Sequence, residues 1–385
     1  MIPAPSLRAP IVALALLASG WTGAQTFTAD TPLLAAPDAA AGPVTRARSG
    51  APAKVLRRQG FWLEVEAGSA RGWVRISSVK LAASSAPLAV DTGRLGANNI
   101  VATSAARSMS AQDLIEGRSD NQAVERLPAF RPDPGQLAQF EQAGALAGGS
   151  SLAPILAAND DEESAGRLWV ARIMGVASLH ASQDLQRYVN LVGSHLAARA
   201  DASRTWRFGV LDTEAVNAFA APGGVVLVTA GLLRQLSSED ELAAVLAHEI
   251  SHVTREHHYQ VIQRTRQYQT VVRGLRVDPG LSRASAQLYA RGLDAASEHE
   301  ADVAGAQLLA RAGYDPSAPL SVLEKLDALG PADPRVTLLA STHPPPRERM
   351  DHLVRAGIEK LPMPTASPQA RHARFNRVVR AALNP

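Results

Sequence analysis

The segment from His248 to His252 reads His-Glu-Ile-Ser-His, and these residue types can bind zinc and activate water. Its hydrophobic spacing predicts a helix over Ser238–His258. On a helix, side chains four residues apart share one face, so His248 and His252 can bind the same ion. Glu249 lies beside them, close enough to contact a water molecule on that ion. The pattern therefore predicts a metal-dependent hydrolase.

A catalytic zinc ion usually has three protein ligands and one position for water. Because the chain has no cysteine, the third ligand must be His, Asp or Glu. Glu298 and Asp302 lie four residues apart in a second predicted helix, over Ala284–Ala312, and share a face. We expect Glu298 to complete a site for one zinc ion per chain. Asp302 would then accept a hydrogen bond from a ligand histidine; the alternative interpretation of this acidic cluster is a solvated helix face.

Such a site predicts hydrolysis of peptide bonds. Zinc lowers the pKa of a bound water to about 7 and polarises the scissile carbonyl. Glu249 is the candidate general base, which takes a proton from the water and donates it to the departing amine. His257 and His258 follow the other histidines too closely on the same predicted helix to serve as the third ligand.

The elements around these residues predict a mainly helical α+β domain over residues 163–385. Ser238 and Glu241 form a capping-box pattern at the start of the first helix, and a further helix is predicted over Pro319–Leu329. Trp206–Leu211 and Val225–Thr229 are predicted strands. The second strand is expected either to border the cleft as an edge that pairs with substrate or to be an ordinary buried strand.

Six blocks occur in order around the predicted site: Trp206–Asp212, Asn217–Gly224, Gly231–Leu233, His248–His252, Glu298–Asp302, and Thr342–Pro345 with Arg349. In these blocks residues 165–355 resemble the zinc metallopeptidase family that includes the HtpX-like, BepA-like and CAAX prenyl endopeptidases. The resemblance implies a zincin-like core with a small sheet, and zinc held by His248, His252 and Glu298. The chain lacks the spanning helices of the integral-membrane members, so it resembles the soluble exported branch.

The resemblance also implies that His343 lies near the cleft as a second catalytic residue. There it would stabilise the oxyanion or occupy the open position of zinc in a resting form. The other interpretation is a loop histidine made rigid by the three prolines that follow it. Arg349 would anchor that loop or the carboxylates of the site.

The first 24 residues predict a signal peptide. Arg8 is their only charge, Ile11–Ala18 is a short apolar run, and Thr22–Ala24 offers small residues for cleavage. The apolar run is much shorter than the roughly 20 residues that a membrane-spanning helix needs. We therefore expect an exported, periplasmic protein of bacterial origin whose mature chain has no transmembrane segment.

Residues 29–81 predict a small β-barrel. The Phe61–Glu66 and Trp73–Ile76 stretches contain strand-forming residues, separated by glycines, and their order resembles the bacterial Src-homology-three-like barrel. Trp62 and Trp73 would either form a groove for a cell-wall or peptide ligand or supply the core. Residues 82–160, rich in Ala, Ser and Gly, are predicted to be a linker with a short helical segment over Ala111–Leu127.

Composition limits the remaining function classes. The formal charge of +3 over 385 residues is too small to indicate nucleic-acid binding. The absence of cysteine excludes a disulfide framework, a cysteine nucleophile and thiolate metal sites. The sequence thus predicts a zinc endopeptidase acting on exported, unfolded or misassembled polypeptides. The alternatives are a non-catalytic binding or chaperone-like protein and a cell-wall peptide amidase.

Overall fold

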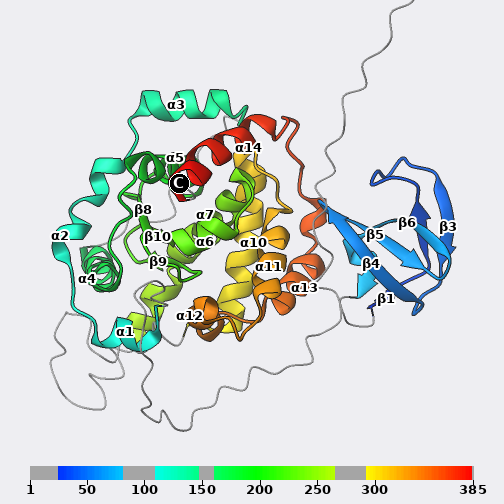
Figure 1. Ribbon diagram of the computed structural model, residues 1–385, viewed down its shortest axis with the longest axis horizontal. Helices are drawn as coiled ribbons and strands as arrows, with labels where there is room; N and C mark the ends of the chain where they lie inside the picture. The colour runs from blue at the N-terminus through cyan, green and yellow to red at the C-terminus, as the bar shows by residue number, and fades with distance from the viewer. Residues whose placement is uncertain (1–24, 81–108, 147–159, 265–291, 384–385) are drawn as a thin grey trace, which may run out of the picture. The chain divides into compact units, whose positions relative to one another are not determined.

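The computed structural model describes residues 25–80, 109–146, 160–264 and 292–383. The chain forms two compact units, Met1–Ala82 and Ala83–Pro385. The first is built from β-strands and the second is mainly helical with a small sheet, which confirms the predicted fold class (Figure 1). The predicted signal peptide, residues 1–24, lies outside the described residues.

The first unit is a β-rich half-barrel of antiparallel strands in the order β3-β2-β6-β5-β4-β1-β7. Alternation of side chains builds its core: in β4, Ala53 and Val55 are buried whereas Lys54 is exposed. The strands are β1 Gln25–Phe27, β2 Thr31–Leu34, β3 Pro43–Ala47, β4 Pro52–Gln59, β5 Trp62–Ala67, β6 Ala70–Arg75 and β7 Val79–Lys80.

The two tryptophans of this unit differ in exposure. Trp73 is only 5% exposed, and the guanidinium of Arg57 lies 4.8 Å from its ring centroid. Trp62 is partly exposed beneath Arg75, at 4.2 Å. Trp73 is therefore part of the core, and a ligand groove at Trp62 stays a prediction.

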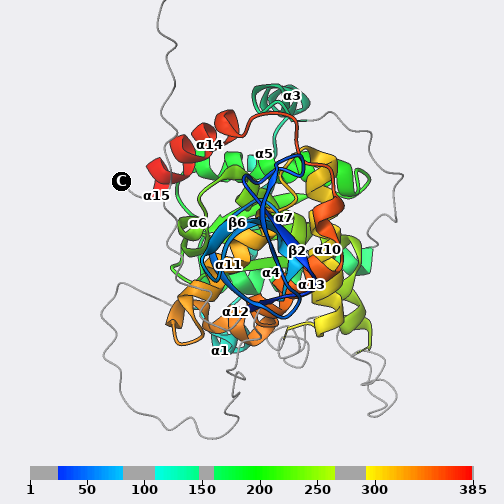
Figure 2. The same cartoon turned by 90° about the vertical axis from the view of Figure 1, so that its right-hand side faces the viewer.

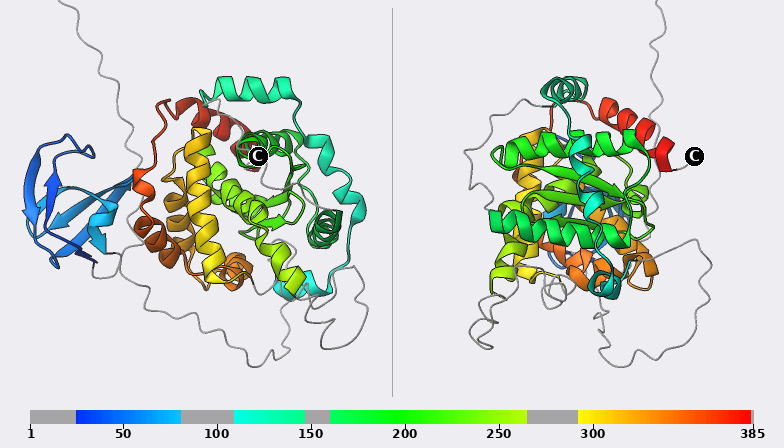
Figure 3. Two further views of the ribbon diagram at one scale, coloured as in Figure 1. Left: turned by 180° about the vertical axis from the view of Figure 1, so that it is seen from behind. Right: turned by 90° about the vertical axis from the view of Figure 1, so that its left-hand side faces the viewer.

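The second unit places α7 among α5, α10 and α11, as the view from behind also shows (Figure 3). None of the helices among the described residues combines the length and the apolar character needed to span a membrane. The helices are α1 Ala111–Glu116, α2 Asn121–Val124, α3 Pro134–Ala143, α4 Asp160–Val176, α5 Gln183–Ala200, α6 Ala230–Gln235, α7 Glu239–Thr254, α10 Ala295–Ala312, α11 Ala318–Leu329, α12 Thr337–Thr342, α13 Pro346–Arg355, α14 Gln369–Phe375 and α15 Ala381–Leu383, with a π-helix over Asn376–Arg380.

The small sheet of this unit has the order β8-β10-β9, with β8 Arg207–Leu211, β9 Ala218–Ala221 and β10 Val225–Thr229. β10 pairs in parallel with β8 and antiparallel with β9, so it is the central strand and not the edge. The turn that makes this possible contains Gly223 and Gly224, whose φ angles are +80° and +95°. The interpretation of Val225–Thr229 as a substrate-binding edge is therefore wrong, and the alternative of a buried strand is confirmed; β8 and β9 are the edge strands of this sheet.

Residues 109–146, predicted as part of a linker, are instead folded onto the helical unit. Ser110 caps α1 as expected, but the predicted helix over Ala111–Leu127 breaks after Glu116. α1, α2, α3 and the residues beside them bury apolar side chains in the cores around α4 and α5: Met109, Leu114, Val124, Leu127 and Phe140. These helices have four to ten residues, too few to show clear periodicity. Residues 81–108 and 147–159 of the predicted linker lie outside the described residues.

Candidate metal centre

The helix α7 carries the first part of the candidate site. Ser238 is its N-cap and accepts a hydrogen bond from the N–H of Glu241. The carboxylate of Glu241 accepts from the N–H of Ser237, so the predicted capping box closes one residue earlier than expected. The helix ends at Thr254, because Glu256 adopts a left-handed φ of +56°, and helical residues resume at 257. The single helix predicted over Ser238–His258 is therefore divided.

His248, His252 and Glu298 converge from α7 and α10 into one cluster. The Nε2 atoms of the two histidines lie 3.0 Å apart. The Glu298 carboxylate lies 3.6 Å from Nε2 of His248 and 3.5 Å from Nε2 of His252. One donor atom from each residue thus falls within 4.8 Å of the others. The spacing seen in the sequence does bring these three side chains together.

This donor set fits a zinc ion. Two imidazoles and one carboxylate are ligands that zinc accepts in catalytic sites. Glu298 is 1% exposed, and its Oε2 has no hydrogen-bond partner within the described parts of the chain. Burial raises the pKa of Glu298, but the neighbouring His343, His248 and Arg349 outweigh it and lower this pKa to about 2. A buried, ionised carboxylate with an unpaired oxygen is an arrangement that a cation would satisfy.

The two histidines differ in their electrostatic environment. Burial and Arg349 lower the pKa of His248, but its contacts with the carboxylates of Asp302 and Glu298 outweigh them, and the net effect raises this pKa to about 9. For His252, burial comes first and the charge on His248 second, and both hold its pKa well below the usual range. Metal ligation requires neutral imidazole, so metal binding would release a proton from His248.

Asp302 holds His248 from the side opposite the cluster. Its Oδ1 lies 3.0 Å from Nδ1 of His248. Arg349 donates two hydrogen bonds to the same carboxylate, of 2.9 Å from Nε and 2.6 Å from Nη2. Burial raises the pKa of Asp302, but Arg349 outweighs this effect and holds the pKa well below its usual range. Of the two positions considered for Arg349, the structure places it on a carboxylate of the site.

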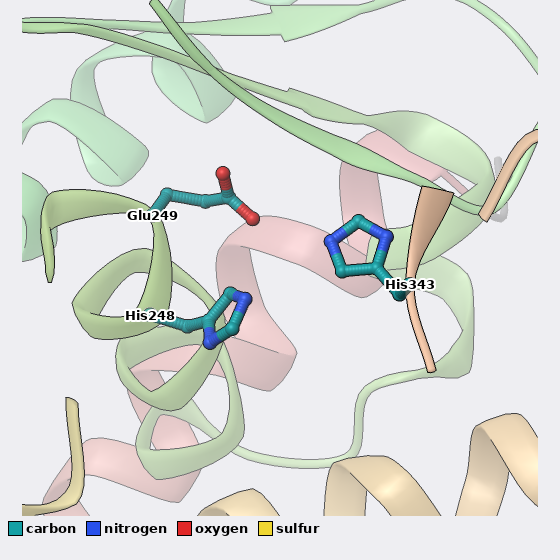
Figure 4. Close-up of side chains that lie close together, drawn as sticks. All are labelled: His248, Glu249 and His343. Atoms are coloured by element: carbon teal, nitrogen blue, oxygen red, sulfur yellow. The ribbon is translucent and has the colours of Figure 1, made fainter. Parts of the chain in front are cut away.

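Glu249 and His343 face the cluster from two directions. Figure 4 shows their side chains and that of His248 pointing toward a common space, with donor atoms from each within 4.8 Å. Burial raises the pKa of Glu249 to about 7, with Glu298 and Asp302 adding to the effect and His248 and Arg349 opposing it. His343 follows α12, and its Nε2 lies 3.7 Å from Oε2 of Glu298. Burial lowers the pKa of His343 to about 4.

Two pockets flank this group and share Ala218, Glu249 and His343. The first lies between α7, α10 and α11 and has a mainly apolar lining. Its apolar residues include Leu232, Val245, Val322, Leu323, Leu326 and Leu339. The second lies beside β9 and reaches His252 and Glu298. The candidate site therefore has a recess on each side of the residues that could do chemistry.

Several residues of the site were not predicted to belong to it. His257 was excluded as a third ligand, yet its ring lies 3.0 Å from Nδ1 of His252. His258 lines the second pocket. Glu300, which received no role, lies 3.4 Å from Nε2 of His257. The left-handed Glu256 places the two histidines there, whereas Glu300 comes from α10, and glutamate at position 256 carries no sequence signal for a turn.

Comparison with known proteins agrees with the site. Residues 183–356 match the model of peptidase family M48. A beta-barrel assembly-enhancing protease of Yersinia pestis is 32% identical over 226 residues, which are 54% of this chain and 46% of the relative. That of Escherichia coli K12 is 32% identical over 205 residues, 49% and 42% of the two chains. Mitochondrial metalloendopeptidase OMA1 of Schizosaccharomyces pombe is 33% identical over 178 residues, 45% and 51%. The chain spans about half the length of these relatives, and the matches indicate a metalloendopeptidase domain.

Proposed function

We propose that this chain, which carries a peptidase family M48 domain over residues 183–356, is a zinc-dependent endopeptidase. The observation that carries the proposal is the convergence of His248, His252 and the buried Glu298, whose Oε2 accepts no hydrogen bond from the described residues, with Glu249 beside them. A zinc ion at that point would polarise the scissile carbonyl and lower the pKa of water.

Glu249 is the proposed general base and acid. Burial raises the pKa of its carboxyl to about 7 in the metal-free chain, so the surroundings favour uptake of a proton, and the carboxyl is placed to accept one from water and return it to the departing amine. Asp302 and Arg349 are proposed to hold His248 by a charged pair, so that its Nε2 faces the metal. Asp302 and Arg349 thus orient His248, whereas Glu249 transfers the proton between water and the departing amine.

Two roles are left for His343. Its Nε2 lies 3.7 Å from Oε2 of Glu298, a proposed metal ligand, so it can donate a hydrogen bond to a developing oxyanion or bind the metal before substrate arrives. A His343→Ala variant separates these roles: loss of turnover supports the first, and gain of turnover supports the second.

Substrate is proposed to bind as an extended segment along β9. This strand is one of the two edge strands of the sheet, and Ala218 at its start lines both pockets. Main-chain pairing with an edge strand binds many sequences, which suits unfolded polypeptides. The predicted export signal and the names of the bacterial relatives favour misassembled exported proteins as substrates, in the periplasm.

Metal analysis combined with proteolysis tests the proposal. The purified chain should bind about one zinc ion, cleave unfolded casein, lose cleavage when treated with a chelator and regain it with zinc. Glu249→Gln should keep the zinc and lose turnover. A chain that binds zinc but cleaves neither casein nor other unfolded proteins would be a binding protein, and release of peptides from purified peptidoglycan alone would indicate a cell-wall amidase.

A further inference from the structure

The two histidines of the candidate centre have different partners at their second ring nitrogens. Nδ1 of His248 faces the carboxylate of Asp302 at 3.0 Å. Nδ1 of His252 faces Nδ1 of another imidazole, His257, also at 3.0 Å. The ring of His257 is buried, and its Nε2 lies 3.4 Å from Oε2 of Glu300. One histidine therefore has an anionic partner and the other an imidazole partner.

A metal bound at Nε2 of His252 would determine which ring nitrogens of His252 and His257 carry protons. A neutral imidazole that binds metal through Nε2 carries its proton on Nδ1, and that N–H donates a hydrogen bond. Nδ1 of His257 must then accept, so the proton of His257 lies on Nε2 and is directed toward Glu300. Nε of Arg255 lies 2.7 Å from the other oxygen of Glu300, and this ion pair holds that carboxylate in place.

The backbone supports this arrangement. In an uninterrupted helix a side chain five residues after His252 would lie about 140° around the axis, and the two rings would point apart. Glu256 instead adopts φ of +56°, which ends α7 and turns His257 back toward His252. A non-glycine residue in this region is uncommon and strained. The contact between the two rings is what this turn produces.

We propose that His257 is a positioning residue for the metal centre: it accepts the hydrogen bond from Nδ1–H of His252 and is itself held by Glu300. This proposal rests on the proposed zinc site. A neutral imidazole raises the basicity of its partner less than a carboxylate does, so His252 is the weaker and His248 the stronger of the two nitrogen ligands. The hydrogen-bonded series His252–His257–Glu300 ends near the surface at the ion pair between Glu300 and Arg255.

Two substitutions at one position separate the hydrogen bond from packing. The amide oxygen of Asn occupies nearly the place of Nδ1 of histidine, so His257→Asn keeps the acceptor. His257→Leu has a similar size and removes it. Loss of such a partner typically weakens metal binding 10- to 100-fold. We therefore expect the zinc dissociation constant, measured by competition with a chromophoric chelator, to rise roughly 10-fold or more in His257→Leu and to stay within about 3-fold in His257→Asn.

The thermal midpoint of the chelator-treated variants is the control for folding, and it should be the same in both. Nitrogen NMR of the zinc-loaded, histidine-labelled chain provides a second measurement. It should show the proton of His257 on Nε2 and not on Nδ1. Equal zinc affinity in the Leu and Asn variants, or a proton on Nδ1 of His257, overturns the role of His257 alone. A wild-type chain that binds no zinc overturns the proposed function together with this inference.

Discussion

Glu249→Gln should stabilise the metal-free protein while abolishing its activity. The Glu249 carboxyl has a pKa of about 7 in the folded chain, raised first by burial, against 4.5 for an ordinary glutamate. The folded state therefore binds a proton that the unfolded state has already released between these two values. Stability falls as the pH rises from about 4.5 to about 7 and stays low above that range. Glutamine has nearly the same shape and does not ionise.

The magnitude follows from the two pKa values. The ionised carboxyl costs the folded state about 0.8 kcal/mol at pH 5 and about 3.4 kcal/mol at pH 8. The advantage of Glu249→Gln over the wild type should thus grow by about 2.5 kcal/mol between these pH values. Urea unfolding of both proteins after chelation measures it. An advantage that is the same at pH 5 and pH 8 would refute the reasoning. Saturating zinc should shrink the advantage, because the cation favours the carboxylate.

Three further outcomes are expected. Glu298→Ala should remove zinc, measured as metal per chain at saturation, whereas Glu300→Ala should keep about one zinc per chain; the reverse result would exchange their roles. Val245→Phe reduces the volume of the apolar pocket beside Glu249. The preferred side chain next to the scissile bond should therefore change from large and apolar to small, as measured by mass spectrometry of digested peptide mixtures. Arg371→Met removes the cation paired with the buried carboxylate of Asp240, which keeps only the hydrogen bond from the N–H of Asp315, and should cost about 3 kcal/mol in urea unfolding. The exposed Arg377→Met should cost less than about 0.5 kcal/mol.

The centre of the site was predictable from the sequence because helical geometry is local. His248 and His252 share a face through their spacing, and Glu298 and Asp302 do so on a second helix, so four side chains needed only two helices in contact. α10 and α7 do pack against each other. The structure brings Glu298 to the two histidines as predicted. The sequence did not say which histidine Asp302 would contact, and the structure places it 3.0 Å from Nδ1 of His248. Their roles in binding metal stay predictions.

Other contacts could not be predicted because they join distant segments. Arg371, Arg374, Arg377 and Arg380 follow one another at intervals of three residues, a spacing that predicts a basic helical surface, yet Arg371 is fully buried and donates to Asp240, 131 residues earlier. Arg374 in the same helix donates to both oxygens of Glu239. α14 also lies beside α3, where Arg374 donates to the carbonyl of Phe140 (Figure 2). Arginines at intervals of three residues predict a solvated helix face. The sequence does not show that buried carboxylates from a distant segment lie opposite two of them.

The same ion pairs explain how the candidate metal ligands can be held in place. The first turn of α7 has three consecutive acidic residues, Glu239–Glu241, and each is paired with a cation from another element. Arg374 and Arg371 of α14 bind the first two, and Lys325 of α11 binds the third at 2.6 Å. Acidic groups at a helix N-terminus also interact favourably with the helix dipole. At the other end of α7, the turn at Glu256 ends the helix and brings His257 into contact with the ring of His252. Because both ends are fixed, His248 and His252 lie on a rigid element, which a metal site requires of its ligands.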